Sequence, residues 1–521
     1  MNRSNETPAD RSKGHAAPIA AAADATATAA TATAEDVTSG PAGTDFLQLD
    51  PAAAPPGGLA DWLATRLRAA IADGRLPTGS RLPATRVLAA ELRVSRGVVT
   101  DAYRRLTEEG QIAGRGRGGT VVLAAPAPPP RPLAPPAPVP PAPFGTAPAP
   151  ESFDVLRAAP ARINLAPGVP DLAAFPRTAW LRAERAVLDD LPAQEFGYGD
   201  PRGTPALRRA VAHWLARNRG IRADPDEVLI VAGAAQALTL LGQVLARDGI
   251  TEVAVEDPGS LGTRQHLGHW LTATPPVPVD AEGIRVDALR ATGAPAVLLT
   301  PAHQFPTGVV LGGGRRRELL RWAGEGGLVL EDDYDAEHRY DRPPVPALRA
   351  VHPEQVCYTG SVSKLLAPAL RTGWLLTPTR YREAVLSAKR FADLGNAALP
   401  QLVLARLMET GELDRHLRLL RPRHRRRRDA MIAAIDAHMP GAVVHGAAAG
   451  LHLMVTFPAG VDCSDTELAT AALAHGVKVQ PLSWHARLPH PPGLVLGYAA
   501  GSAGEITEGI AILGRLLRRI G

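Results

Sequence analysis

Apolar residues near the start of the chain recur at helical spacing. In residues 59–72, leucine, isoleucine and tryptophan return every three or four positions, which predicts an amphipathic helix that ends at an Asp-Gly pair. The same spacing predicts two further helices at 85–92 and 96–109. Residues 111–123 then give two β-prone runs around a tip of glycine and arginine. The pattern therefore predicts a helix-turn-helix followed by a hairpin wing.

The third predicted helix has an apolar face and a polar face. We expect Val98, Ala102 and Leu106 to face the core, and Thr85 and Ser95 to cap the second and third helices. In a helix-turn-helix, the start of this helix enters the major groove of double-stranded DNA, and basic side chains on a wing contact phosphates. The residues at outward positions or near the helix start are Arg96, Gly97, Thr100, Arg104 and Arg105, with Arg115 and Arg117 on the hairpin.

A different pattern begins after residue 160. Short, nearly continuous runs of Val, Ile and Leu alternate with helical stretches, which predicts an α/β fold with a mostly parallel sheet covered by helices on both faces. The runs are at 228–233, 252–257, 296–300, 328–334, 356–360 and 373–377.

Polar side chains gather where these predicted strands end. Ligands of such sheets bind outside the carboxyl ends of the strands, so the sequence predicts one pocket there. The residues are Gly233 to Gln236, Glu256, Asp257, His303, Asp332, Tyr334, Ser361, Ser363 and Lys364.

Composition divides the 521 residues into parts. Residues 59–123 hold eleven arginines against six Asp or Glu, a net charge of +5 that equals the net charge of the whole chain. Between residues 126 and 150, 13 of 25 residues are proline, which favours an extended, stiff segment. We therefore expect a disordered Ala/Thr-rich tail (1–50), a small basic domain (55–123), a Pro/Ala-rich linker (124–155) and a large domain (160–521) with a smaller C-terminal subdomain (about 400–521).

Lysine is rare in the chain, and one lysine lies in the predicted pocket. The chain has 53 arginines and four lysines: Lys13, Lys364, Lys389 and Lys478. A lysine amine forms a Schiff base with an aldehyde, whereas a guanidinium stays protonated and unreactive.

A cofactor would explain the other polar residues around this lysine. A buried carboxylate at Asp332 needs a cationic partner, which a protonated pyridine nitrogen would provide. Pyridoxal phosphate (PLP) supplies the aldehyde, this nitrogen and a phosphate group. Hydroxyls, an arginine and the amides that open a helix suit the phosphate. They are present at Ser361, Ser363, Arg371 and the residues after Gly233.

Residues 59–123 resemble the GntR-type winged helix. The resemblance rests on GRLPTGSRLP (74–83), LAAELRVSR (88–96) and the glycine-rich wing. It implies a DNA operator as a partner. The implied DNA contacts are Arg86, Ser95, Arg96, Gly97 and the wing residues Arg115 to Gly118. A solvated basic bundle that contacts protein is the alternative interpretation.

From about Ile163 onward the chain resembles fold type I aminotransferases. With the basic domain and linker in front, it resembles the MocR family of regulators, and within that family those that control PLP synthesis. The motifs are FGYGDPRGTPALR (196–208), GAAQAL (233–238), VEDPG (255–259), PAHQFPTG (301–308), EDDYDAEHRY (331–340) and GSVSKLLAPALRTGW (360–374). The resemblance implies PLP, a homodimer and a C-terminal α+β subdomain.

The resemblance also implies roles for individual residues. Lys364 would form the Schiff base, Asp332 would pair with the pyridinium, and Tyr334 would donate a hydrogen bond to the PLP phenolate. The phosphate would be held by Ser361, Ser363, Arg371 and the amides of Ala234 and Ala235, and Tyr198 would reach in from a second protomer.

Three departures favour a regulator over an enzyme. Ser260 stands where many relatives have a ring that stacks on PLP, and Phe305 replaces an asparagine of aminotransferases. LVLGYAAG (494–501) lacks the arginine that binds a substrate carboxylate, unless Arg487 or another arginine substitutes. We therefore expect a transcriptional regulator that senses PLP, or else an amino compound such as γ-aminobutyrate or taurine. A working aminotransferase with an attached DNA-binding domain, and a DNA-binding protein whose pocket has lost PLP, are the alternatives.

Several other features exclude function classes. No apolar run approaches the ~20 residues of a membrane span, and the start does not read as a secretory signal, so we expect a cytoplasmic protein. Two cysteines are too few for a disulfide scaffold. The histidine pairs 266/269 and 485/490 lack neighbouring carboxylates or cysteines, so no metal site is predicted. The arginine run at 421–429 is interpreted as a solvated helix face.

Overall fold

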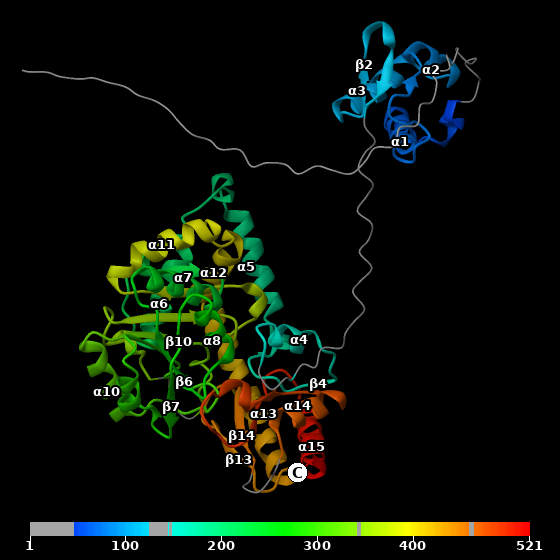
Figure 1. The fold of residues 1–521 in the computed structure, drawn as a ribbon. Helices are drawn as coiled ribbons and strands as arrows, with labels where there is room; N and C mark the ends of the chain where they lie inside the picture. The colour runs from blue at the N-terminus through cyan, green and yellow to red at the C-terminus, as the bar shows by residue number, and fades with distance from the viewer. Residues whose placement is uncertain (1–45, 124–143, 145–147, 341–344, 458–462, 521) are drawn as a thin grey trace, which may run out of the picture. The chain divides into compact units, whose positions relative to one another are not determined.

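The computed structural model describes residues 46–123, 144, 148–340, 345–457 and 463–520 (Figure 1). The chain divides at Val139 and Pro140 into two compact units, a small N-terminal one and a large C-terminal one. Each has its own hydrophobic core. No helix in the described part of the chain is long and apolar enough to cross a membrane.

The small unit has the predicted winged helix-turn-helix. The three helices lie on one core, and the hairpin joins a short strand in a sheet of order β1-β3-β2. The elements are α1 (Leu59–Ala72), β1 (Arg81–Leu82), α2 (Thr85–Glu91), α3 (Arg96–Glu108), β2 (Ile112–Gly114) and β3 (Thr120–Val122).

Two details of the small unit differ from the prediction. Thr85 is the first residue of α2 and not its cap, since Ala84 occupies that position without a side-chain hydrogen bond. Val99, and not Val98, is fully buried, because the core face of α3 also includes Tyr103, whose hydroxyl donates to the carbonyl of Pro83 at 2.9 Å. The cap at Ser95 is present: its Oγ accepts from the amide of Val98.

The large unit is built on an eight-stranded sheet of order β5-β12-β11-β10-β9-β6-β7-β8. Strands are present at all six predicted positions. The strands are β5 (Leu229–Val231), β6 (Val253–Asp257), β7 (Pro276–Asp280), β8 (Gly283–Ile284), β9 (Ala296–Leu299), β10 (Leu328–Asp333), β11 (Val356–Ser361) and β12 (Gly373–Leu376). The sequence missed β7 and β8 because β7 contains two prolines, which are tolerated near the edge of a sheet.

The sheet is mostly parallel, as predicted, but β8 is antiparallel to β7, and among the six predicted strands β12 is antiparallel to its neighbours. β12 pairs antiparallel with both β11 and β5, whereas β5, β11, β10, β9 and β6 run parallel to one another. Gly373, at the start of β12, is opposite Ser361 on one side and Val231 on the other. The start of β12 therefore lies beside the ends of β5 and β11, and it brings Arg371 to the same edge of the sheet.

Helices cover both faces of this sheet, as predicted (Figure 1). On one face, α7 (Ala234–Arg247), α8 (Leu261–Gly268) and α11 (Thr379–Asp393) pack against alternate residues of the strands. The other face is covered by α6 (Pro205–Arg219), α9 (Val286–Thr292), α10 (Gly313–Gly324) and α12 (Ala398–Glu409). α5 (Arg177–Asp190) packs on α12.

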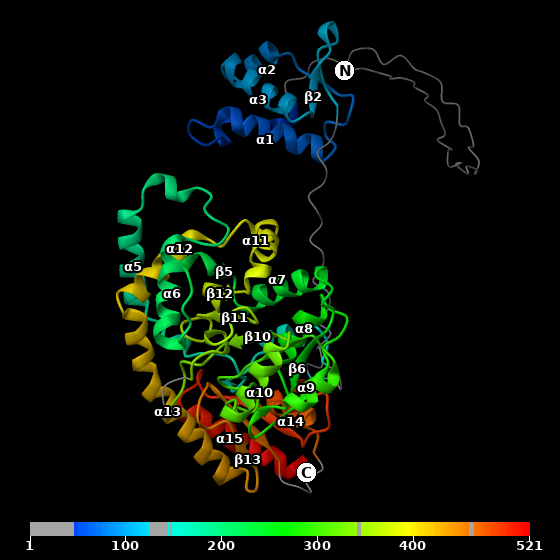
Figure 2. The same cartoon turned by 90° about the vertical axis from the view of Figure 1, so that its left-hand side faces the viewer.

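A smaller subdomain packs around a four-stranded antiparallel sheet of order β13-β14-β17-β16. Helix α13 extends from the helices of the large sheet to this subdomain (Figure 2). The elements are α13 (Glu412–His438), β13 (Val443–His445), β14 (His452–Thr456), α14 (Asp465–Ala474), β15 (Val477–Lys478), β16 (Gln480–Pro481), β17 (Gly493–Gly497) and α15 (Ala503–Ile520).

The subdomain also contains chain from the region predicted as linker. Phe144 packs on Trp484 with ring centroids 5.3 Å apart, and α4 (Ser152–Ala158) begins within the predicted 124–155 linker and ends beyond it. β4 (Ile163–Asn164) pairs with β15. Side chains from this stretch form part of the hydrophobic core of the C-terminal subdomain. Composition alone does not reveal this. At the other end of the chain, residues 46–50 of the predicted tail are described, and Leu47 and Leu49 pack on the small core.

The arginine run at 421–429 is a solvated face only in part: Arg421, Arg425 and Arg426 are exposed, as predicted. Arg423 and Arg427 both pair with the buried carboxylate of Asp171, at 2.9 and 2.8 Å. Arg428 lies over the ring of Tyr340, 4.9 Å from its centroid. The run therefore connects α13 to the rest of the large unit.

Candidate functional site

A cavity of about 510 Å³ lies where the large sheet meets the C-terminal subdomain. All of the predicted cofactor residues except Tyr198 line it: Ala234, Ala235, Asp332, Tyr334, Ser361, Ser363, Lys364 and Arg371. Glu256, Asp257 and His303, which were predicted at strand ends, do not line it. The carboxylate of Glu256 instead accepts from the amide and hydroxyl of Thr300, both at 2.9 Å.

The alternation of side chains along β10 separates its acidic residues. Glu331 and Asp333 face away from the cavity: Glu331 accepts from the amides of Leu348 and Arg349, and Asp333 pairs with Arg219 at 2.5 Å. Asp332 faces the cavity. The strand thus gives two of its carboxylates partners within the protein, although one oxygen of Asp333 is left without a hydrogen bond among the described residues, and it presents the third carboxylate to the cavity.

Asp332 has no cationic partner at hydrogen-bond distance. Its Oδ1 is buried and has no hydrogen-bond partner among the described residues. Burial, reinforced by the charges of Asp333 and Asp335, raises the pKa of Asp332 to about 7. A protonated ring nitrogen at this position would supply both the missing hydrogen bond and the missing positive charge.

Lys364 follows β11 and extends into the same cavity. Its Nζ donates to the backbone carbonyl of Gly168. Burial lowers its pKa, against the opposing charges of Asp335 and Asp332, so the unprotonated, nucleophilic amine is favoured more than in water. Gly168 has φ +81°, and a Cβ there would be 3.0 Å from Nζ, so a side chain at this position would crowd the lysine.

The phosphate end of the site is formed where β5, β11 and β12 meet. The first amides of α7, after Gly233, have no partners within the helix and carry its positive dipole. A Cβ on Gly233 would be 3.4 Å from the guanidinium of Arg371. Arg371 makes no ion pair among the described residues and donates to the carbonyl of Ala232. The donor set therefore fits PLP.

Tyr334 is held by a buried group of polar side chains. The Nδ1 atom of His303 is 3.0 Å from the hydroxyl of Tyr334 and 2.9 Å from a carboxylate oxygen of Asp335. A carboxylate only accepts hydrogen bonds, so His303 Nδ1 donates its proton to Asp335. Burial, together with the interaction of the Tyr334 hydroxyl with the same carboxylate, raises the pKa of Tyr334, and the tyrosine also lines the cavity, where the resemblance implies a hydrogen bond to PLP.

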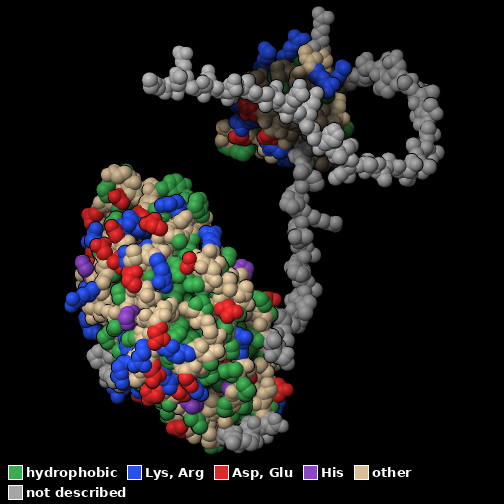
Figure 3. Space-filling model, turned by 60° about the vertical axis from the view of Figure 1, so that its left-hand side comes forward, with side chains coloured by type: hydrophobic (Ala, Val, Ile, Leu, Met, Phe, Trp, Pro, Cys, Tyr) green, Lys and Arg blue, Asp and Glu red, His purple; other side chains and the backbone are tan. Residues whose placement is uncertain are grey.

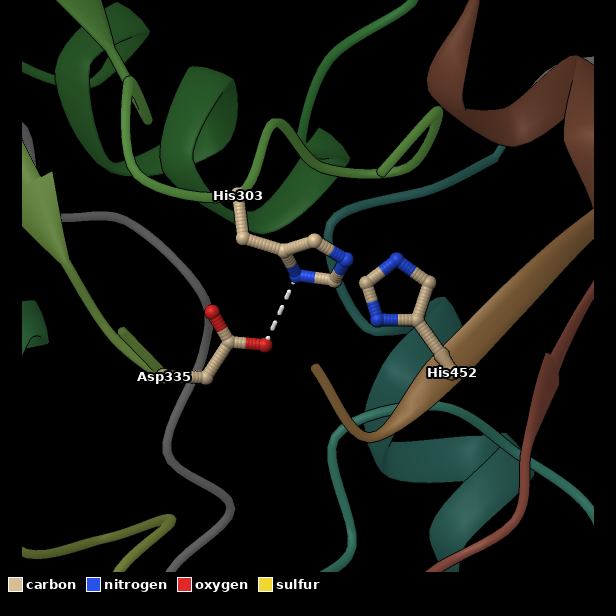
Figure 4. Close-up of side chains that lie close together, drawn as sticks. All are labelled: His303, Asp335 and His452. Carbon is tan, nitrogen blue, oxygen red and sulfur yellow. Dashed lines mark hydrogen bonds and ion pairs between the residues drawn. The ribbon is translucent and has the colours of Figure 1, made fainter. Parts of the chain in front are cut away.

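No pattern in the sequence predicted that His303, Asp335 and His452 would lie together. Their ligand atoms all lie within 4.8 Å of one another, and all three residues are buried (Figure 4). The Asp335 oxygen bonds directly to His303 Nδ1, and His452 Nε2 is 3.2 Å from the carbonyl of Pro306. These contacts are those of a hydrogen-bonded network that orients Tyr334. The signal that would have placed Asp335 here is its spacing after Asp332 and Tyr334.

The departures from aminotransferases have structural counterparts. Ser260 lines the cavity, and its hydroxyl caps α8 by accepting from the amide of Thr263 at 3.3 Å. Phe305 lies edge-on to Tyr334, with centroids 6.2 Å apart. Arg487 does not reach the cavity: its guanidinium donates to the carbonyl of Thr274 at 2.6 Å. Of the alternatives left open, the structure therefore contradicts a replacement of the missing arginine by Arg487.

Two basic residues of the cavity wall, Arg157 and Lys478, were not predicted from the sequence. Arg157 lies between the predicted linker (124–155) and the predicted large domain (160–521). Lys478 lies between two valines, Val477 and Val479, that are fully buried. A rare lysine in an apolar strand was the available signal.

Tyr198 lies outside this cavity. Its side chain is 98% exposed. Within one chain it contributes nothing to the site, so its predicted role depends on a second protomer.

On the small unit, the residues implied to contact DNA are accessible. Arg86, Ser95, Arg96, Gly97, Thr100 and Arg115 are exposed; the side chain of Arg117 lies outside the described residues. Arg104 and Arg105, in contrast, pair with Asp101 on their own helix. Basic side chains are visible on the surface of this unit, with acidic ones among them, and the visible face of the large unit likewise carries both signs of charge (Figure 3).

Comparisons with known proteins agree with both units. The family model of aminotransferases of class I and II matches residues 161–513, and that of bacterial regulatory proteins of the GntR family matches residues 59–122. The probable rhizopine catabolism regulatory protein MocR of Rhizobium meliloti is 31% identical over 466 residues, 85% of this chain and 91% of the relative. The pyridoxine biosynthesis transcriptional regulator PdxR of Corynebacterium glutamicum is 31% identical over 416 residues, 79% and 86% of the two chains.

A solved structure supports the fold of the large unit. The multiple substrate aminotransferase of Thermococcus profundus matches with a TM-score of 0.64 and 28% identity, over 70% of this chain and 93% of that one. The chain therefore belongs to the MocR family of transcriptional regulators, in which a GntR-type DNA-binding domain is joined to an aminotransferase-type domain that binds PLP.

Proposed function

We propose that this regulator senses PLP, and that occupancy of the cavity sets its affinity for operator DNA. The observation that carries the proposal is the buried Oδ1 of Asp332, which has no hydrogen-bond partner among the described residues and belongs to one cavity with Lys364 and the residues proposed to bind phosphate. PLP would supply a ring nitrogen to Asp332, an aldehyde to Lys364 and a phosphate to the phosphate-binding residues. The name of the relative PdxR, a regulator of pyridoxine biosynthesis, supports the same interpretation.

Helix α4 contributes to the wall of the cavity and, in the chain, follows the segment that joins the two units. Phe153, Leu156 and Arg157 of this helix line the cavity, and α4 is the first helix after the segment that joins the two units. A ligand that shifts α4 would therefore act on the end of that segment.

We also propose that the protein acts as a homodimer in which Tyr198 completes the site of the partner. Support comes from exposed rings and aliphatic side chains on the large unit, which are costly to leave in water. They include Leu181, Phe196, Tyr198, Phe391 and Leu394, which are 59–98% exposed.

A visible absorption spectrum of the purified protein, with and without PLP, tests this function. PLP held covalently by Lys364 supplies an absorbing group whose band reports binding, and we expect that band in the wild type and its complete loss in Lys364→Ala. Binding to the DNA upstream of its own gene is measured on the same samples. We expect PLP to change the DNA affinity of the wild type and not that of the variant.

Two results would contradict the proposal. If Lys364→Ala kept the band, another lysine would hold PLP. If the wild type bound PLP with no effect on DNA affinity, PLP would be a resident cofactor and the sensed ligand would be an amine. Steady turnover of an amino acid with an oxo acid would instead support the aminotransferase alternative, with the same residues in catalytic roles.

A further inference from the structure

A second lysine is buried in the wall of the cavity. Lys478 lies on β15, opposite Asn164 of β4 in the register of the two strands, and both residues line the cavity. Lys478 is only 7% exposed. None of the residues assigned to PLP lies on β4 or β15, so Lys478 belongs to a different part of the wall.

The ammonium group of Lys478 has no negative partner. Its Nζ donates one hydrogen bond, to the backbone carbonyl of Arg157 at 3.1 Å, and no carboxylate in the described part of the chain pairs with it. The buried Lys389, by comparison, pairs with Asp393 at 2.6 Å. A buried cation without a counter-charge is costly, and burial accordingly lowers the pKa of Lys478. An anion in the cavity would remove that cost.

We propose that Lys478 binds the anionic group, a carboxylate or sulfonate, of a small amine that enters the cavity beside PLP. This inference rests on the part of the proposed function that places PLP at Lys364, because the amine end would be recognised by that PLP, whether or not PLP alone also changes the affinity for DNA. LVLGYAAG (494–501) lacks the arginine that binds a substrate carboxylate in aminotransferases. Lys478, on a different strand, would then take over its role. The regulator would select amines that carry an acid group over neutral amines of the same length.

The other cations in the wall are less suited to this role. Arg371 and the start of α7 are committed to the phosphate. The side chain of Arg157 is 74% exposed and pairs with Asp154, so its charge is already neutralised and screened.

A purely structural role for Lys478 makes a different prediction. Lysine side chains stabilise helix C-termini by donating to the last carbonyls, and Arg157 is near the end of α4. That role uses one donor and needs no ligand. Glutamine at 478 keeps a donor for this carbonyl but removes the charge, whereas arginine keeps the charge.

The test compares two matched probes on the PLP-loaded full-length protein. 4-Aminobutyrate and n-butylamine have the same chain length and differ by a carboxylate in place of a methyl group. Each is titrated into wild type, Lys478→Gln, Lys478→Arg and Arg157→Gln, and both the absorbance of bound PLP and operator DNA affinity are followed. 2- and 3-Aminobutyrate then vary the distance between amine and carboxylate.

We expect the wild type to bind one of the aminobutyrates at least tenfold more tightly than butylamine, since hydrogen bonds between charged groups are worth that much. Lys478→Gln should lose this preference while it binds PLP and butylamine like the wild type, which also shows that it is folded. Lys478→Arg should keep most of the preference, and Arg157→Gln all of it.

Each contrary result overturns the inference in a distinct way. A preference retained in Lys478→Gln places the anion elsewhere, at Arg157 if Arg157→Gln loses it. Equal binding of all the probes by the wild type, or no response to any of them, means that Lys478 only caps α4. A wild type without the PLP band contradicts the proposed function itself, and the spectrum shows this before any amine is added.

Discussion

The small unit and the cavity of the large unit differ in where their unpaired charges lie: at the surface in the first and mainly in the interior in the second. On α3 the arginine at the start of the helix, Arg96, is exposed and makes no ion pair among the described residues, whereas Arg104 and Arg105, further along, are neutralised by Asp101. An exposed charge without a partner costs little, because water solvates it. Such charges suit a ligand like DNA, which is met at the surface and is itself highly charged.

In the cavity, unpaired charge is buried and therefore expensive. Most ionic groups around it are paired within the protein, as Asp333 is with Arg219. The exceptions that line the cavity in the described part of the chain are Asp332, Lys364 and Lys478, together with the more exposed Arg371. An unpaired charge marks a binding site in both units, but it is the stronger marker in the interior, since only a ligand can offset the cost of burial.

The strongest way to break this comparison is to remove the buried charge of Asp332. Because its pKa is raised to about 7, the folded protein without PLP holds a proton that the unfolded chain releases between about pH 4 and pH 7. This carboxyl therefore lowers stability progressively as the pH rises through that window. Asp332→Asn should stabilise the PLP-free protein by on the order of 1–4 kcal/mol at pH 8, with a smaller gain at pH 5.

The same variant should bind PLP about 100-fold more weakly, since the ring nitrogen loses its ionic partner. Denaturant unfolding at the two pH values and PLP titration measure the two effects. Asp333→Asn is the matched control on the same β-strand. It leaves the buried Arg219 without its ionic partner and should therefore destabilise the protein. A destabilised Asp332→Asn would show that Asp332 is satisfied without PLP.

The surface half of the comparison is tested at Arg96. Arg96→Ala should weaken operator binding about tenfold and reduce its salt dependence, without changing the PLP spectrum. Arg104→Ala, on the same helix but paired with Asp101 and Glu108, is the control and should have a much smaller effect. A larger loss in Arg104→Ala than in Arg96→Ala would mean that α3 meets DNA through a different face. Fluorescence anisotropy with labelled operator DNA at several salt concentrations measures both.

Local patterns were sufficient to predict the helices of the small unit and six strands of the large sheet. Each of those elements is specified by its own apolar spacing, and the pocket residues follow strands that end at one edge. Lys364, Asp332 and Arg371 could be placed together for that reason. The direction of β12 could not, because an apolar strand of four residues reads the same in either direction.

Long-range packing accounts for what the sequence did not reveal. The interpretation of 124–155 as linker failed at Phe144 and α4, whose partners lie more than 300 residues away around Trp484. Lys478 was missed for the same reason, since its exposure to the cavity depends on β4 and α4. His303 and Asp335 come from different loops, and only their mutual hydrogen bond identifies them as supports for Tyr334.

The smallest expected effect concerns Ser95, which has a structural role as a helix cap and an implied role in DNA binding. Its Oγ caps α3 by accepting from the amide of Val98 at 3.4 Å, and the resemblance also implies a DNA contact. Ser95→Ala should cost about 1 kcal/mol and lower the hydrogen-exchange protection of α3 amides about fivefold. Ser95→Asp keeps a cap and suits the helix dipole, so protection should persist, while its charge repels phosphates and weakens DNA binding. If both variants weakened DNA binding equally and left protection unchanged, Ser95 would act as a DNA contact alone and the α3 start would be stable without its cap.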